Sequence, residues 1–510
     1  MRIILVSPHS PVFSTRIGIG NQIPLGLLSI GGPLSDAGHQ VSLLDVDAHG
    51  FSRREASEQI FATKPDLIMI GHSGSTTAHP ESMALARIIK RHLPNIPIVY
   101  GGVYPTYHAR SILKADPVVD IIVRGEGERT ASLVANALEN SLSLADIQGV
   151  TFMDGNKIIE TKNAPLIENL DEYRTGWELI KNWDLYQCWG VGRAAAIQIS
   201  RGCPHQCSYC GQNGFWQRWR RRDPVKIVDQ IELLYRNHGI RFINIADENP
   251  AVSRKAWRQF LEELCRRNLP MSLFCGMRAA DIVRDADLLP LYRKAGIVCV
   301  NLGIETTDPK TIRLIRKGSS VADDYRALFL LRQNKILSMA GHVIGFQADD
   351  KIGFLDTLRS LYAYNPDFLN ALHATPHSWT PFARESMARS VVQTDLGRWD
   401  YRHQVLAVED LTHWQTFFWV KGLEMVYHLR PTALWRLLLH PDRRFRLGLR
   451  WCYFRMARVW LAEIGDFILH LRFEPNPKTL DSFLQNPTNQ QDIRPAKHNA
   501  PLSMKVLKGT

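Results

Sequence analysis

The chain has no long hydrophobic run and little cysteine. None of its apolar stretches reaches the roughly 18 to 20 uninterrupted residues that cross a membrane. The opening run, residues 1–8, is typical of a β-strand rather than of a signal peptide. Eight cysteines in 510 residues, three of them bunched, do not make the disulfide framework of a secreted protein. We therefore expect a globular, cytoplasmic protein without a membrane span.

The balance of charge does not identify a partner. The net charge is +12, which is compatible with a nucleic acid, an anionic membrane surface or an acidic small molecule. No recognised nucleic-acid-binding module is present, so we expect no nucleic acid partner. With 45% hydrophobic residues, the chain is long enough for two or three folded domains.

The bunched cysteines are Cys203, Cys207 and Cys210, at CxxxCxxC spacing. Thiolates at this spacing can hold three irons of a [4Fe-4S] cluster and leave the fourth iron open for a substrate or cofactor. A zinc knuckle is the alternative, but zinc usually takes four closed ligands, often as two CxxC pairs. His205 could complete a zinc site only from inside the cramped loop.

The first third of the chain alternates short β-branched runs with amphipathic helices such as 81–93. Five buried strands are predicted, at 3–6, 41–46, 67–71, 98–102 and 121–125. This order indicates a doubly wound parallel sheet, which binds ligands outside the carboxyl ends of its strands.

Glycines and polar residues stand at those predicted strand ends. Glycine there lets a ligand approach the backbone closely, although tight turns alone would also explain each one. The candidate binding residues are Ser73, Gly101, Gly102, Gly125, Glu126, Gly127 and Glu128.

Beyond residue 190, strand and helix alternate again. Six strands are predicted, at 195–199, 242–246, 273–276, 298–303, 340–345 and 368–374, which indicates an incomplete (β/α)6 barrel. Candidate site residues follow these strands: Asp247, Glu248, Glu305, Ile344 and Gly345. A pair of carboxylates at a strand end is costly unless it binds a cation, although any one acid could simply cap a helix or face solvent.

The cysteine loop, with Tyr209 before its last cysteine, resembles the radical SAM signature. The resemblance implies that the open iron chelates S-adenosylmethionine and that Tyr209 lies near the adenine. It implies further that Asp247 and Glu248 contact the methionyl amine and that Glu305 reaches the cofactor. Ile344 and Gly345 stand where the family has a Gly-rich turn, but the usual Pro-Gly is replaced by Gln347-Ala348.

The N-terminal strand ends resemble the cobalamin-binding domain that precedes many radical SAM cores. The matching parts are 24–27, Gly101-Gly102 and the run 125–128. The DxHxxG motif that supplies a histidine to cobalt is absent after the first strand. The resemblance therefore implies cobalamin without a histidine lower ligand, and a sheet that has lost its cofactor is the alternative.

Several stretches resemble the anaerobic magnesium-protoporphyrin monomethyl ester cyclase group, which includes bacteriochlorophyllide C-methyltransferases. They are 201–216, 222–224, 246–250 and 287–290. The resemblance covers residues 1–400 and implies a tetrapyrrole substrate in bacteriochlorophyll biosynthesis, with a one-electron donor such as flavodoxin or ferredoxin. We favour C-methylation of a tetrapyrrole side chain, the commoner chemistry for this domain pair, with oxidative cyclisation or methylation of another apolar substrate as alternatives. His373, Thr375, His377 and Trp379 are candidates for the lining of the substrate pocket, although a histidine in such a place is more often hydrogen-bonded packing.

The C-terminal part is predicted to be helical over 400–472, with a core face on one side. That face comprises Leu437, Leu438, Phe445, Leu449 and Tyr453, opposite several arginines. The arginines form either a solvated face or a surface for anionic lipid or an acidic tetrapyrrole. The expected boundaries are 1–145 for the cobalamin-binding domain, 146–190 for a linker with one hairpin, 191–395 for the radical SAM core, 396–474 for the helical domain and 475–510 for a disordered tail.

The motifs are also compatible with two rival functions. A tRNA methylthiotransferase has further cluster cysteines in its N-terminal domain, but no cysteine precedes Cys188 here, so we exclude it. A cobalamin-binding sensor with an idle cluster loop stays open, because the sequence alone does not distinguish a working loop from an idle one.

Overall fold

The structure is a computed structural model that describes residues 1–9, 22–72, 76–212, 214–346, 351–408, 411–470 and 477–485. Ser73 and Gln347-Ala348 lie outside the described residues, as does most of the predicted tail.

The N-terminal domain is built on a seven-stranded sheet of order β2-β1-β3-β4-β5-β6-β7. Neighbours among β1 to β5 pair in parallel, whereas β6 and β7 form an antiparallel hairpin that extends the sheet. The strands are β1 (Arg2–Ser7), β2 (Gln40–Asp45), β3 (Leu67–Gly71), β4 (Ile98–Gly101), β5 (Ile121–Val123), β6 (Val150–Asp154) and β7 (Lys157–Glu160). The five predicted strands are confirmed, and the hairpin expected in the linker belongs to this sheet.

Helices cover both faces of this sheet. Side chains alternate along a strand, so Leu5 points to one core while Ile4 and Val6 point to the other. The helices are α2 (Leu25–Asp36), α3 (Val46–His49), α4 (Arg53–Ala62), α5 (Ala78–His92), α6 (Val103–Ala115) and α7 (Gly127–Glu139). Buried residues of α2 and α7 join the first core, and those of α4, α5 and α6 join the second. The doubly wound arrangement is confirmed.

The second domain is a curled sheet of order β16-β15-β14-β13-β12-β9-β8. Its six long strands are parallel, and β8 pairs antiparallel at one edge. The strands are β8 (Gln187–Cys188), β9 (Gly192–Ile197), β12 (Phe242–Ile245), β13 (Ser272–Met277), β14 (Ile297–Glu305), β15 (Leu337–Ile344) and β16 (Phe368–His373). Because β8 and β16 do not pair, the barrel stays open, as predicted.

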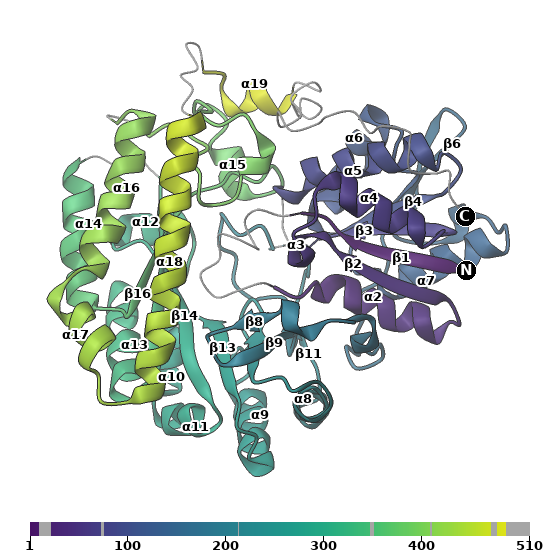
Figure 1. Ribbon diagram of the computed structural model, residues 1–510. Coiled ribbons are helices and arrows are strands. Elements are labelled where there is room, and N and C mark those ends of the chain that lie inside the picture. The colour runs from purple at the N-terminus through teal and green to yellow at the C-terminus, as the bar shows by residue number, and fades with distance from the viewer. Residues whose placement is uncertain are drawn as a thin grey trace.

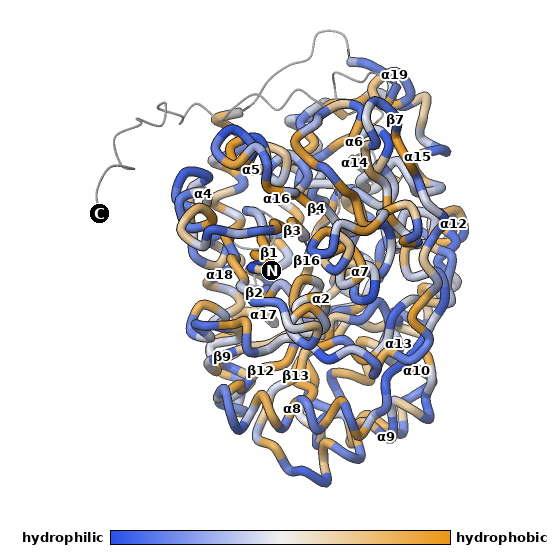
Figure 2. Tube along the Cα trace, turned by 90° about the vertical axis from the view of Figure 1, so that its right-hand side faces the viewer, coloured by the Kyte–Doolittle hydropathy of each residue, from blue (hydrophilic) through white to orange (hydrophobic). Residues whose placement is uncertain are grey.

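Helices pack against the convex side of this half-barrel. They are α8 (Pro224–His238), α9 (Arg254–Arg267), α10 (Ala279–Arg284), α11 (Leu289–Lys294), α12 (Pro309–Leu314), α13 (Val321–Gln333) and α14 (Lys351–Tyr364). In Figure 2, β12 and β13 are largely hydrophobic, whereas α8 alternates between hydrophilic and hydrophobic positions. That contrast is typical of buried parallel strands beneath amphipathic surface helices.

The C-terminal region is helical and closes the concave side of the half-barrel. It comprises α16 (His413–His428), α17 (Pro431–Leu439) and α18 (Arg443–His470), with the short α15 (Pro381–Glu385) and α19 (Leu480–Gln485) nearby. Leu449 and Cys452 of α18 pack against inward-facing Phe242, Phe274 and Phe368. Figure 1 shows α18 in front of the half-barrel, with the N-terminal domain on the other side of the molecule.

One part of the predicted C-terminal core face is wrong. Leu438 is 56% exposed, whereas Leu449 is buried. The helical conformation is interrupted between α17 and α18. Pro441 lies in this interruption, where it cannot continue a helix. The periodicity therefore does not run on from Leu438 into α18.

Candidate functional site

The cysteine loop lies at the carboxyl end of β9 and borders a cavity of about 230 Å³. Two short strands, β10 (Ser200–Arg201) and β11 (Arg220–Arg221), pair antiparallel and close the base of the loop. The loop is tightly packed there: Gly202 has φ +85, and a Cβ on it would lie 2.5 Å from the Arg218 carbonyl oxygen. Only glycine fits this approach without strain.

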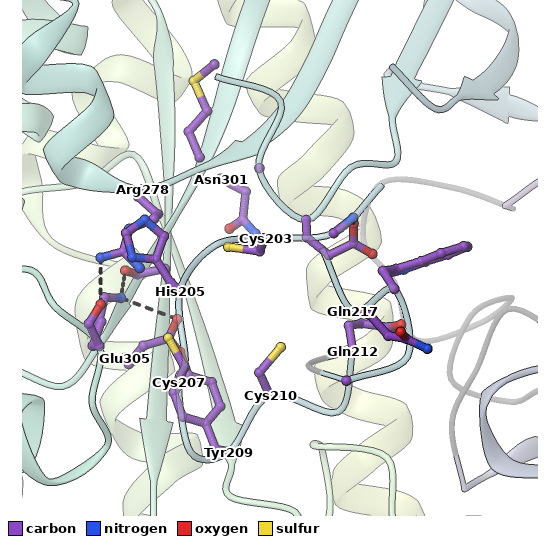
Figure 3. A pocket seen from close by; sticks show the side chains of 18 residues that line it. Cys203, His205, Cys207, Tyr209, Cys210, Gln212, Gln217, Arg278, Asn301 and Glu305 are labelled. Carbon is purple, nitrogen blue, oxygen red and sulfur yellow. Dashed lines mark hydrogen bonds and ion pairs between the residues drawn. The ribbon is translucent and has the colours of Figure 1, made fainter. Parts of the chain in front are cut away.

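Cys203, Cys207 and Cys210 all line this cavity (Figure 3). Among the described residues, no three His, Cys, Asp or Glu side chains converge as they would around a single metal ion. A four-iron cluster needs a wider arrangement, because each thiolate binds a different iron. Burial raises the pKa of the Cys203 and Cys207 thiols, so cluster binding would release their protons. The donor set therefore fits a [4Fe-4S] cluster.

Tyr209 and Glu305 lie on the same cavity wall. Glu305 ends β14 with φ +66, and its Oε1 lies 3.4 Å from Nζ of the buried Lys317. Lys317 also donates to the carbonyl of Gly303. Burial, and then the charge of Glu305, raise the pKa of Tyr209 well above its ordinary value. The centroid of the Tyr209 ring lies 5.1 Å from that of the Phe346 ring. This contact holds the uncharged Tyr209 side chain in place.

The two adjacent carboxylates Asp247 and Glu248 have different surroundings. Glu248 lines the cavity and accepts a hydrogen bond from the Gly202 amide at 3.2 Å. Asp247 accepts from the Ile199 amide at 2.8 Å and from the Ser200 amide and hydroxyl at 2.6 and 2.5 Å. Burial raises the pKa of Asp247 to about 7. The structure thus gives Asp247 the role of holding the start of the cysteine loop, because its oxygens are occupied there.

Ile344 and Gly345 do not belong to the described lining of this cavity. Ile344 packs in a small core with Phe354 and Val420. Gly345 has φ +89, and its carbonyl accepts from Arg389 Nη1 at 2.8 Å. Ile344 and Gly345 therefore pack next to the site without lining its cavity. Phe346, which follows them, is the residue of this segment that contacts Tyr209.

A larger cavity of about 450 Å³ lies between the two domains. Its lining is mostly apolar, with Leu27, Met69 and Phe215 among the side chains. It also includes six predicted residues: Gly101, Gly102, Gly125, Glu126, Gly127 and Glu128. Ser73, the seventh, lies outside the described residues.

The glycines of this larger cavity leave its edge open. Gly102 has φ +120, and Gly125 has φ +78 with nothing within 4 Å of the place where a Cβ would stand. A flat macrocycle such as cobalamin could therefore reach the backbone at these points. His72 is the one histidine among the described lining residues, and its Nε2 lies 3.0 Å from Tyr100 Oη.

Glu126 and Glu128 line the larger cavity but direct their carboxylates to arginines. Arg201 lies 3.0 Å from Glu126 and also pairs with Glu128, and Arg220 lies 2.9 Å from Glu126. Burial acts to raise the pKa of Glu126, but the Arg220 hydrogen bond and the Arg201 charge hold it below its ordinary value. These two acids therefore join the N-terminal domain to the base of the cysteine loop.

The two cavities have a common wall. Gln212, Trp216 and Glu248 line both of them. Sequence reasoning missed Gln212, Trp216, Arg201 and Arg220 as site residues. The one feature of the sequence that could have indicated them is their nearness to the cysteine motif, because the stretch 201–216 resembles the cyclase group.

None of the four residues His373, Thr375, His377 and Trp379 is among the described lining residues of either cavity, so the structure favours hydrogen-bonded packing for them. The N-terminal domain covers this strand end instead. The Nδ1 atom of His377 lies 2.9 Å from Thr76 Oγ1. The Trp379 ring stacks on the Tyr107 ring, and their centroids are 5.0 Å apart. Burial lowers the pKa of His377 to about 3, so it is neutral within the domain interface.

Two family models match this chain. The B12 binding domain matches residues 20–135, and the Radical SAM superfamily matches residues 197–358. These ranges contain the larger cavity's glycines and the cysteine loop, respectively.

Similar proteins agree with this division. An anaerobic magnesium-protoporphyrin IX monomethyl ester cyclase of Synechocystis sp. is 45% identical over 97% of this chain and 99% of its own length. A protein of the same name from Cereibacter sphaeroides is 32% identical over 81% of this chain and 68% of its own. The solved radical S-adenosylmethionine methyltransferase TsrM of Kitasatospora setae, with cobalamin and a [4Fe-4S] cluster bound, has a TM-score of 0.67 at 16% identity, covering 92% of this chain and 99% of that one.

The open half-barrel with its cysteine loop, the glycine-edged sheet domain and these relatives identify the class of enzyme. Its cofactors are a [4Fe-4S] cluster, S-adenosylmethionine and cobalamin. None of the helices in the described part of the chain is both long and apolar enough to cross a membrane. The chain belongs to the anaerobic magnesium-protoporphyrin IX monomethyl ester cyclase family of cobalamin-dependent radical SAM enzymes.

Proposed function

We propose that this protein catalyses the anaerobic oxidative cyclisation of magnesium-protoporphyrin IX monomethyl ester. The observation that carries the proposal is the 45% identity, over nearly the whole chain, to a protein named for that reaction. Methyl transfer, which we favoured from the sequence, has weaker support, because the methyltransferase structure is similar in fold at only 16% identity. The cyclase therefore replaces it as the main proposal.

The cavity beside the cysteine loop suits the cluster and S-adenosylmethionine. In this proposal Cys203, Cys207 and Cys210 hold three irons, and Tyr209 flanks the adenine. Glu248 and Glu305 provide negative charge for the ammonium and sulfonium groups, and Arg278 on the same lining can receive the carboxylate. When bound, the two cofactors supply one-electron chemistry that removes a hydrogen atom from an unactivated carbon.

The larger cavity suits cobalamin and an adjoining apolar substrate. In this proposal Gly101, Gly102, Gly125 and Gly127 border cobalamin, while Glu126 and Glu128 stay paired with their arginines. The apolar lining excludes water from a large macrocycle. Asp247, Ile344 and Gly345 act as supporting residues rather than as ligands. A flavodoxin or ferredoxin supplies the electrons.

Mass spectrometry of the product tests the reaction. Purified protein, reconstituted anaerobically, is incubated with the monomethyl ester, S-adenosylmethionine, cobalamin and a one-electron reductant. Cyclisation adds one water and removes six hydrogen atoms, so the product gains one oxygen and loses four hydrogens. The oxidant would be three molecules of S-adenosylmethionine, each of which takes up two electrons and a proton as it is cleaved to methionine and 5′-deoxyadenosine. With ¹⁸O-labelled water, the new keto group carries the label.

Two other results would contradict the proposal. A product heavier by one CH₂ for each transferred methyl group would restore methyl transfer. Bound cluster and cobalamin without any cleavage of S-adenosylmethionine would favour the sensor. The Cys207→Ala variant serves as the inactive control in each incubation.

A further inference from the structure

Helix α18 has an apolar face that points away from the half-barrel. Leu447, Phe454, Leu461 and Ile468, which we call the α18 stripe, are between 52% and 66% exposed. They recur every seven positions, so they follow one side of the helix, opposite the buried Leu449 and Cys452. A soluble helix packed on one face normally carries polar residues on the other. The α18 stripe is therefore an unpartnered apolar surface.

The neighbouring helices resemble α18 in this respect. Exposed apolar side chains occur on α16, on α17 and at the end of α18, and these helices lie together in Figure 1. The largest are Trp414, Phe418, Leu429, Trp435, Leu439 and Leu469. Many exposed large apolar side chains on adjacent helices are typical of a region that meets a partner or a membrane.

The exposed charge on α18 is positive. The helix carries six arginines, and its two acids, Glu463 and Asp466, are already paired with Arg402 and Arg398 at 2.6 and 2.8 Å. Arg443 and Arg450 stand one turn before Leu447 and Phe454, on the same side of the helix.

Three of these arginines are not paired with a carboxylate. Arg443, Arg450 and Arg458 are exposed, and within the described ranges none of them forms an ion pair with an acidic side chain. The α18 stripe is thus flanked by positive charge that no carboxylate of the described residues pairs with, although Arg450 also donates to the carbonyl oxygens of Leu437 and Leu438 at 3.1 and 3.4 Å.

This combination selects one kind of occupant. We propose that the α18 stripe and its flanking arginines dock the protein on an anionic lipid surface, with α18 lying in the plane of the headgroups. Apolar side chains enter the acyl boundary while arginines meet the lipid phosphates. The proposal does not rest on the reaction.

Two other occupants fit the charge less well. Two copies of the chain joined through α18 would bring unneutralised arginines together. The C-terminal segment 486–510 carries Arg494, Lys497, Lys505 and Lys508 against the single acid Asp492, so it too would add positive charge.

Co-sedimentation with vesicles tests the proposal on the full chain. Phosphatidylcholine vesicles with and without phosphatidylglycerol are mixed with the wild type, with Leu447→Gln/Phe454→Gln/Leu461→Gln and with Arg443→Gln/Arg450→Gln/Arg458→Gln. The wild type is expected to bind the anionic vesicles, and less tightly as salt rises. The arginine variant should lose roughly fivefold in partitioning to the anionic vesicles for each charge removed, and the apolar variant should also lose binding to them.

A matched control separates this surface from general hydrophobicity. Val225→Gln/Leu233→Gln/Leu314→Gln removes three apolar side chains of similar exposure on α8 and α12 and should bind like the wild type. Circular dichroism and the melting temperature confirm that each variant is folded. Vesicle binding that neither α18 variant weakens would overturn the proposal.

Two further results would also overturn it. One is a wild-type dimer, measured by light scattering, that the apolar variant dissociates while no vesicle binding occurs. The other is binding that appears only when residues 486–510 are removed, since the tail would then cover this face in the full chain.

Discussion

Arg201 Nη1 lies 3.0 Å from Glu126 Oε1, and this ion pair joins the base of the cysteine loop to the N-terminal domain. Both side chains are almost fully buried, and Arg201 also packs over the Trp216 ring at 5.0 Å. Residues 75 positions apart in the sequence therefore hold the N-terminal domain against the base of the cysteine loop.

Removing Arg201 should destabilise the protein strongly. In Arg201→Ala, Glu126 and Glu128 lose a buried partner, and breaking such a pair costs roughly 3–5 kcal/mol. Chemical denaturation, with intrinsic fluorescence as the readout, measures the change. Arg54→Ala, which removes the solvent-exposed pair with Glu58, is the control and should melt like the wild type. Equal stability of the two variants would show that the buried network is not structural.

Removing one cysteine of the loop should abolish the cluster. We expect Cys207→Ala to lose most of its iron and sulfide after anaerobic reconstitution and to cleave no S-adenosylmethionine, because one iron lacks its thiolate. Iron and sulfide assays together with 5′-deoxyadenosine quantification check this. Cys265→Ala, on α9 and outside the cavity lining, should retain both. Cleavage that survives in the Cys207 variant would refute the ligand assignment.

Filling the glycine edge of the larger cavity should weaken cobalamin binding. A Cβ on Gly101 meets only ordinary contacts at 3.7 and 3.8 Å, so Gly101→Leu keeps the backbone unstrained while its side chain enters the cavity. We expect at least a tenfold weaker affinity, about 1.4 kcal/mol, from titration of the cobalamin absorbance. Gly465→Leu, at an open position on α18, is the control. Unchanged affinity would place cobalamin elsewhere.

Asp247 should make stability depend on pH. Its folded pKa, about 7, is raised above the ordinary value of 3.8, so the folded state holds a proton that the unfolded state has released between these values. This contribution is fully present below pH 3.8 and is lost as the pH rises through 7. From pH 5 to pH 8 the wild type should therefore lose more stability than Asp247→Asn. Denaturant midpoints of both proteins at pH 5 and pH 8 measure this loss. An equal change of midpoint in the two proteins would contradict the raised pKa of Asp247.

The strands and the cysteine loop could be predicted from sequence because their signals are local. Runs such as Ile3–Val6 and Phe242–Ile245 are short, β-branched or aromatic, and bounded by polar residues. The break before α18 was also visible in Pro441, but the helical periodicity on either side concealed it. Local pattern thus sufficed for elements and failed where two periodic segments met.

The contacts between domains could not be predicted in the same way. Glu126 looked like a cofactor ligand because the chain alone does not show that Arg201 and Arg220 fold onto it. His377 looked like a pocket residue because its burial depends on how Thr76 and Tyr401 dock around it. In both cases the partners of the side chain are far away in the sequence.

The common wall formed by Gln212, Trp216 and Glu248 has a consequence for the evolution of this enzyme. A substitution at any of these three residues alters both cavities at once, whereas a residue that lines one cavity alone, such as Tyr209 or Leu27, can change without altering the other. Trp216 has the bulkiest side chain of the three and therefore forms the largest part of the wall between the two cavities. A relative that accepts a differently shaped macrocycle would be expected to differ at this position before it differs at the cysteines.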